Sequence, residues 1–190
     1  MATLSGWPWG AAIRFVPLLC GLVLPGRAAS AQDPALEYRV KAAYLLNFTR
    51  YTEWPPTAFA GPSDALNVCI VGRDPFGSLL DQTLRARRTS GRPLHILRPA
   101  RPTEGLCHVA FLGAATPAVL ESWLTALATE PTLTVGEGDS FVDAGGMIGF
   151  VIVDETVRFE INAPAARTAR LQLSSRLLAL ATRLVPEQRP

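Results

Sequence analysis

The sequence LNVCIVG, at residues 66–72, determines the fold class that is predicted for this chain. The stretch is short and almost entirely apolar, and turn-forming residues flank it, as is typical of a buried strand. Asp74 and Pro75 follow at once and predict the start of a helix that continues to Leu84. A strand followed directly by a helix makes one α/β unit.

The same order of elements recurs further along the chain. Short strands are predicted at residues 92–98, 107–112 and 132–135. A helix is predicted from Pro117 to about Ala128. Residues 147–153 and 156–161 predict a hairpin that turns at Asp154-Glu155. Together these elements predict an α/β fold in a single domain, with a mixed β-sheet flanked by helices and a late β-hairpin.

Helices are also predicted at both ends of this domain. Asp33-Pro34 offers an N-cap followed by proline, and apolar residues then recur at helical spacing as far as Tyr51. Pro55-Pro56 ends this helix, because proline cannot continue one. A C-terminal helix is predicted over residues 164–184.

The N-terminus has the pattern of a secretory signal peptide. Arg14 precedes an apolar run of about ten residues, and Ala29-Ser30-Ala31 is a small-x-small cleavage pattern. The run is well short of the roughly 20 residues that a membrane-spanning helix needs. We therefore expect residues 1–31 to be removed, residues 32–190 to form the domain, and the mature protein not to be inserted in a membrane.

Charge argues against a nucleic-acid partner. Removing residues 1–31 removes Arg14 and Arg27 and no acidic residue, which leaves 16 basic and 16 acidic residues. Affinity for nucleic acid comes largely from neutralised phosphates, and the mature chain has neither a positive excess nor a basic stripe. We expect no nucleic-acid partner.

Two cysteines, Cys69 and Cys107, remain after processing. In an oxidising compartment paired thiols become disulfides, so a bridge between them is the first interpretation. Two unpaired buried cysteines are the alternative. A metal site is less favoured, because Cys69, Cys107, His95 and His108 show no metal-ligand spacing.

The sequence shows no pattern of catalytic or cofactor-binding residues. The glycine-rich residues 136–146 lack both the lysine of a phosphate-binding loop and a G-x-G-x-x-G before a helix, so turn formation explains them better. His95 and His108 have no activated nucleophile near them in a known pattern. We expect no enzyme activity, no cofactor and no metal.

Three residues of the first helix and its end are candidate ligand or partner contacts. Lys41 is the only lysine of the chain, and its alternative role is an ordinary surface lysine. Tyr51 and Trp54 could form an aromatic contact site, because such rings dominate binding hot spots, although packing in the core is the commoner outcome.

Several blocks of sequence span nearly the whole mature chain and lie at residues 40–48, 53–55, 67–72, 74–76, 107, 133–135, 141, 145–148, 159–162 and 171–180. In this order, the blocks resemble the YfiR-like family of bacterial periplasmic proteins. The resemblance implies a periplasmic regulator that binds the periplasmic domain of an inner-membrane diguanylate cyclase. Binding would repress that enzyme and lower cyclic di-GMP and biofilm formation. The family's disulfide fits Cys69 and Cys107.

Two functions therefore compete. For a repressor, we expect Phe150, Phe159, Leu171, Leu173 and Leu177 to serve docking or packing. The alternative is a periplasmic small-molecule sensor, or an adaptor for another membrane receptor, that uses the glycine-rich loop and the aromatic residues near Trp54. A second copy of the chain, in a homodimer, is a further candidate partner.

Overall fold

The computed structural model describes residues 34–102 and 106–186. The predicted signal peptide, at residues 1–31, lies outside the described residues, as does the predicted N-cap Asp33. No helix among the described residues is long and apolar enough to cross a membrane.

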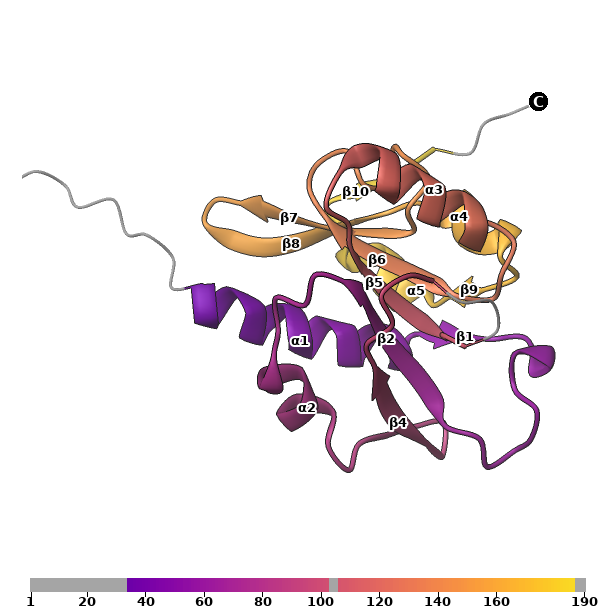
Figure 1. Cartoon of the computed structure of the whole chain (residues 1–190). Coiled ribbons are helices and arrows are strands. Elements are labelled where there is room, and N and C mark those ends of the chain that lie inside the picture. The colour runs from indigo at the N-terminus through magenta and orange to yellow at the C-terminus, as the bar shows by residue number, and fades with distance from the viewer. Residues whose placement is uncertain (1–33, 103–105, 187–190) are drawn as a thin grey trace, which may run out of the picture. The chain divides into compact units, whose positions relative to one another are not determined.

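An eight-stranded mixed sheet forms the centre of the domain (Figure 1). Its strand order is β10-β8-β7-β6-β5-β2-β4-β3. The strands are β2 (Leu66–Gly72), β3 (Arg88–Thr89), β4 (Arg92–Leu97), β5 (Val109–Gly113), β6 (Leu133–Glu137), β7 (Ile148–Val153), β8 (Thr156–Ile161) and β10 (Arg183–Leu184). Neighbours from β4 to β7 pair in parallel, and β7 pairs with β8 in an antiparallel hairpin. The predicted α/β fold with a mixed sheet and a late hairpin is confirmed.

Helices cover both faces of this sheet. The helices are α1 (Pro34–Arg50), α2 (Ser78–Leu84), α3 (Pro117–Leu127), α4 (Ala163–Thr168) and α5 (Ser175–Leu180). Alternate residues of β2 enter two different cores, because side chains of a strand point to opposite faces. Val68 and Ile70 pack in the core under α1 and α2, whereas Cys69 and Val71 pack in the core under α3.

The C-terminal region differs from the single helix predicted over residues 164–184. It forms α4, the strand β9 (Gln172–Leu173), α5 and β10 in turn. Arg170 has a positive φ of 61°, which ends α4 and buries Leu171. Ser174 then caps α5 by accepting a hydrogen bond from the Leu177 amide. The prediction of one continuous helix was wrong, because the turn at Arg170 and the cap at Ser174 interrupt the helical spacing of apolar residues.

Three further short elements, β3 among them, were not predicted, and one helix begins later than predicted. The strand β1 (Thr52–Glu53) pairs with β9, and a short 3-10 helix, η1 (Pro56–Ala58), follows it. Helix α2 begins at Ser78 and not at Asp74. A carboxylate oxygen of Asp74 accepts hydrogen bonds from the amides of Phe76 and Gly77, which forms a turn before the helix.

Candidate functional site

The carboxyl ends of the parallel strands create a crevice. From β2 the chain crosses to β4 on one side and then returns to β5 on the other, so the direction of winding reverses between β2 and β5. Ligands of open α/β sheets bind outside the carboxyl ends of the strands at such a point. A cavity of about 430 Å³ lies there, lined among others by Arg73, Gly113, Thr116, Glu121, Glu137 and Ser140. We call it the carboxyl-end crevice.

Glycines allow the walls of this crevice to approach each other. A Cβ atom on Gly113 would lie 2.1 Å from the carbonyl oxygen of Arg73, and the Arg73 amide donates a hydrogen bond to the Gly113 carbonyl at 3.0 Å. In the predicted glycine-rich loop, Gly136 and Gly146 enclose the ring of Phe141, where any side chain would collide. These glycines therefore serve close packing, while Ser140 and Phe141 of the same loop line the crevice.

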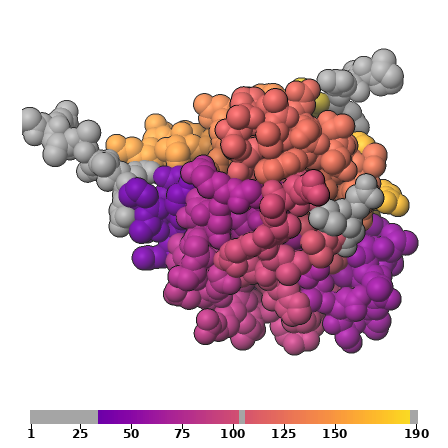
Figure 2. Space-filling model, viewed as in Figure 1, coloured from indigo at the N-terminus to yellow at the C-terminus, as the bar shows by residue number. Residues whose placement is uncertain are grey.

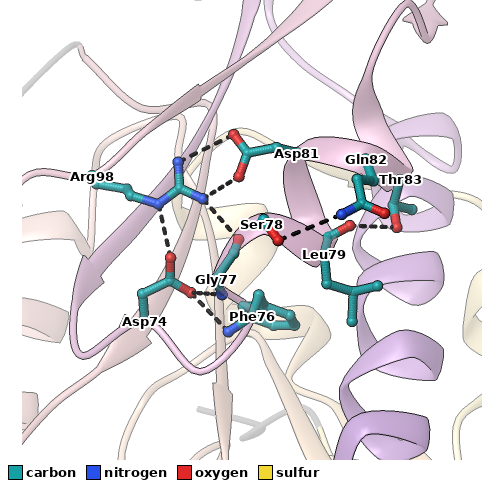
Figure 3. Close-up of polar contacts among 9 residues, drawn as sticks. All are labelled: Asp74, Phe76, Gly77, Ser78, Leu79, Asp81, Gln82, Thr83 and Arg98. Carbon is teal, nitrogen blue, oxygen red and sulfur yellow. Dashed lines mark hydrogen bonds and ion pairs between the residues drawn. The ribbon is translucent and has the colours of Figure 1, made fainter.

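An arginine clamp fixes the loop that follows β2 (Figure 3). The Arg98 guanidinium donates to Asp74 Oδ2 at 2.8 Å, to Asp81 Oδ2 at 2.5 Å and to the carbonyl of Gly77 at 3.0 Å. The hydrogen bond from Arg98 lowers the pKa of Asp81. Phe76 from this loop is buried against Phe111, with ring centroids 4.9 Å apart. The clamp thus holds the backbone next to Arg73 in place.

Among the described residues that line this crevice, Arg73 is a cation without an ion-pair partner. Its side chain is exposed, and it makes no ion pair with any described residue. Arg73 was not among the predicted site residues. Its position directly after a buried strand was the available signal, because a residue there lies at the carboxyl edge of the sheet.

Lys41 is buried within an ionic cluster. Its ammonium group contacts Glu37, one turn earlier in α1, and lies 2.5 Å from Glu137 Oε1 at the end of β6. Burial alone would lower the pKa of Lys41, but hydrogen bonds to Glu137 and Glu37 outweigh it and raise the pKa. The ammonium also lies 4.7 Å from the centroid of the Tyr38 ring. The predicted ligand contact Lys41 is therefore a structural charge that joins α1 to the crevice residue Glu137.

An apolar surface lies where the start of α1 meets the tip of the β7–β8 hairpin. Figures 1 and 2 show the hairpin, in orange, projecting beside the start of α1, in indigo. The Lys41 ammonium of α1 lies 5.8 Å from the ring centroid of Phe150 in β7, so the helix and the hairpin are close to each other. Leu36, Val40 and Ile152 are 55%, 36% and 48% exposed. We call these three residues the α1–hairpin surface.

A groove continues this surface along α1. It has a volume of about 320 Å³ and is lined by Arg39, Val40, Ala43, Tyr44 and Asn47. Arg39 is exposed and has no ion-pair partner among the described residues. The surface therefore combines apolar side chains with one unpaired positive charge.

The residues predicted for docking or packing lie mainly in the core. Phe150, Phe159, Leu171 and Leu177 are each no more than 2% exposed, and Leu173 is partly buried against the same core. The rings of Phe150 and Phe159 pack around Phe48 of α1, at centroid distances of 5.7 and 5.2 Å. Burial leaves Phe150, Phe159, Leu171 and Leu177 almost no exposed surface, which favours packing among the two roles expected for them, whereas Leu173 keeps part of its surface exposed.

Trp54 and Tyr51 also pack against this core and are only partly exposed. The Trp54 indole donates to the carbonyl of His108 at 3.1 Å. The His108 ring accepts a hydrogen bond at Nδ1 from the Asn67 amide, donates from Nε2 to the Ala58 carbonyl, and stacks on a neighbouring aromatic ring. Burial lowers the pKa of His108, so the neutral ring holds the segment after β1 against the sheet.

Cys69 of β2 and Cys107, which precedes β5, form a disulfide between neighbouring strands. Their Cα atoms lie 5.7 Å apart. The alternative of two free cysteines does not hold in this structure. Among the described residues, no three His, Cys, Asp or Glu side chains gather into a group that could hold a metal ion.

Most of the chain matches the model of a known protein family. Residues 38–182, which include most of α1, the crevice strands and the hairpin, match the model of a family described as YfiR/HmsC-like. The chain belongs to the YfiR/HmsC-like family. A comparison with curated proteins gave no match. The family is one of periplasmic, non-enzymatic regulators, so a surface for recognition matters more here than a catalytic centre.

Proposed function

We propose that this YfiR/HmsC-like protein docks on the periplasmic domain of an inner-membrane signalling protein, a diguanylate cyclase, and represses it. Repression lowers cyclic di-GMP and, with it, biofilm formation. The observation that carries the proposal is the α1–hairpin surface in a member of a family of periplasmic regulators.

The chemistry of this surface supports a protein partner. Monomeric proteins rarely leave apolar side chains grouped next to a groove unless a partner covers them. Val40 takes part in both the exposed surface and the groove, and the rigid core beneath them, from Tyr44 to Phe150, holds both in shape. Such preorganisation lowers the entropic cost of binding.

The chemistry of the α1–hairpin surface predicts which side chains the partner places against it. Its centre is apolar, so the partner needs apolar or aromatic side chains to fill the groove. Arg39 lies at the groove with no carboxylate partner in the described part of the chain, so an acidic group of the receptor would face it.

Intracellular cyclic di-GMP tests the proposed function. A strain that lacks the gene is complemented with the full chain or with a chain that lacks residues 1–31. We expect cyclic di-GMP to rise on deletion and to fall again only with the full chain, because the receptor domain lies in the periplasm. Unchanged cyclic di-GMP in the deletion strain would contradict repression of a cyclase.

A periplasmic small-molecule sensor is the second candidate, and the carboxyl-end crevice favours it. Its volume of about 430 Å³ lies within the usual range of ligand sites, and Arg73 gives it a free cation. A ligand that binds only the folded protein raises its melting temperature. We expect phosphate, succinate or glutamate to raise the melting temperature of the wild type and not of Arg73→Gln. Equal shifts in both proteins would exclude the crevice.

A further inference from the structure

A cluster of arginines lies at the opposite end of α1 from the α1–hairpin surface. Arg85 follows α2, and Arg87 and Arg88 lead into the edge strand β3. All three side chains are exposed. We call these three residues the basic edge. The near-neutral charge of the mature chain concealed it, because three positive charges lie within four residues while acidic residues are spread elsewhere.

The backbone holds the basic edge outward. Ala86 and Ser90 both have positive φ, at 57° and 51°, and mark two tight bends on either side of Arg88. The Arg87 amide donates to the Leu84 carbonyl at 3.0 Å, and Arg88 pairs with Pro93 of β4. Because Thr89 is buried, its neighbour Arg88 points away from the core.

In the described part of the chain, no carboxylate forms an ion pair with an arginine of the basic edge. Asp81, the acidic residue that Arg85 influences, is bound by Arg98 through both of its carboxylate oxygens. The Arg88 guanidinium donates only to a backbone carbonyl, that of Gly91. Within the described ranges, the three arginines of the basic edge have no ion pair.

A fourth arginine extends the charge. Arg50 is exposed at the end of α1, and its neighbour Thr49 shares a hydrogen bond of 2.9 Å between hydroxyl groups with Thr89 of β3. This contact brings the last turn of α1 against the basic edge. The positive charge therefore spans two elements that are far apart in the sequence.

We propose that the basic edge binds the surface of an anionic phospholipid bilayer. Basic residues near an anionic lipid surface are attracted to its headgroups, and this attraction needs no insertion of side chains into the bilayer. The large exposed apolar side chains of the described chain lie elsewhere, at Leu36, Val40, Ile152, Val153, Leu180 and Leu184. A protein interface normally needs an apolar or aromatic anchor at its centre, whereas a headgroup layer needs only charge.

An acidic protein surface is the alternative partner. A groove of about 440 Å³ between α2 and β4 includes Arg85 in its lining together with Leu94 and Ile96. Both apolar residues are already partly buried, so they offer little anchor. If a protein were the partner, vesicles of lipid alone would not bind the chain, which makes this alternative an outcome of the test.

Binding at the basic edge would also orient the protein. Helix α1 has 17 residues and therefore measures about 25 Å from end to end, with Leu36 in its first turn and the basic edge against its last turn. With the basic edge on the membrane, the α1–hairpin surface faces away from the bilayer. This consequence rests on the proposed docking function, whereas membrane binding itself does not.

Co-sedimentation with vesicles tests the proposal. The chain from Gln32 to Pro190 is mixed with vesicles of phosphatidylcholine alone or of equal parts of phosphatidylcholine and phosphatidylglycerol. We expect binding only to the anionic vesicles, with loss at high salt because screening weakens it. Each arginine contributes about a fivefold gain in affinity, so Arg85→Gln, Arg87→Gln and Arg88→Gln together should lower affinity by more than about tenfold.

Two matched variants complete the experiment. Replacement of the same three residues by lysine keeps the charge and should keep binding within a few-fold of the wild type. Replacement of Arg158, Arg170 and Arg176 by glutamine removes the same charge from other exposed positions and should leave most of the binding. If the triple glutamine variant melts early, the single change Arg87→Glu takes its place. No binding of the wild type, or equal loss in both glutamine triples, would overturn the proposal.

Discussion

The ammonium group of Lys41 holds two carboxylates from different elements, Glu37 of α1 and Glu137 of β6. Its removal would leave these carboxylates close together without a compensating charge. Both carboxylate side chains keep about a quarter of their surface exposed, so the cost is smaller than for fully buried ions. The Lys41 cluster therefore stabilises the position of α1, and with it the α1–hairpin surface.

We expect Lys41→Met to lower the free energy of unfolding by about 3 kcal/mol, because breaking a buried ion pair leaves unpaired charge. Urea unfolding at neutral pH measures this change. Glu37→Gln, which keeps the Lys41–Glu137 pair, is the control and should cost less. A loss under about 0.5 kcal/mol for Lys41→Met would mean that solvent already screens the cluster.

His108 predicts how stability depends on pH. Burial lowers the pKa of His108 in the folded state, so the unfolded chain binds this proton more readily. Stability is therefore fully present above the ordinary histidine pKa and falls as the pH drops below about 6.5. The slope from this group cannot exceed about 1.4 kcal/mol per pH unit.

Urea unfolding of the wild type and of His108→Gln from pH 7 to pH 5 measures this effect. Glutamine also offers one acceptor and one donor, but it does not titrate in this range. We expect the wild type to lose more stability than the variant over this interval. Parallel pH profiles would show that the pKa of His108 is the same in the folded and the unfolded state, which would contradict this account.

At the scale of elements, the disulfide ties β2 to the start of β5 beside the His108 hydrogen bonds. It closes a loop with a sequence separation of 38 residues. The chain-entropy model gives about 4 kcal/mol for such a loop. We expect the double variant Cys69→Ala and Cys107→Ala to unfold at correspondingly lower urea concentration, and dithiothreitol to destabilise only the wild type. Equal midpoints with and without the reductant would contradict the bridge.

The strands and the hairpin could be predicted from the sequence because their signals are local. LNVCIVG is apolar throughout, and the predicted turn Asp154-Glu155 joins β7 to β8, with Val153 paired to Thr156. Elements that depend on distant partners could not be predicted. Strand β1 exists because Thr52 pairs with Leu173, which no local pattern of two residues announces.

The site was less predictable than the fold, because exposure is set by the packing of whole elements. Phe150 and Phe159 carry the residue types of a docking site, yet α1 covers them. Lys41 carries the residue type of a helix surface, yet Glu137 binds it from another element. Arg73 and the basic edge are candidate sites because of their places at the end of β2 and at the edge of the sheet. The amino-acid composition does not reveal these places.

At the scale of the whole molecule, the two ends of α1 differ in chemistry. The start of α1 and the hairpin tip present apolar side chains, and the end of α1 and β3 present arginines. The carboxyl-end crevice shares Glu137 with the Lys41 cluster, so it lies beside the apolar end. If the proposals above hold, these surfaces would give the protein separate places for a receptor, a ligand and a membrane.

Cyclic di-GMP in the deletion strain, complemented by surface variants, tests most directly whether the α1–hairpin surface docks on the receptor. Val40→Glu with Ile152→Glu places charge on that surface, and Leu180→Glu with Leu184→Glu changes a matched exposed apolar pair elsewhere. With equal periplasmic levels and melting temperatures, we predict that only the first pair fails to lower cyclic di-GMP. Full repression by the Val40→Glu and Ile152→Glu protein would contradict docking through this surface.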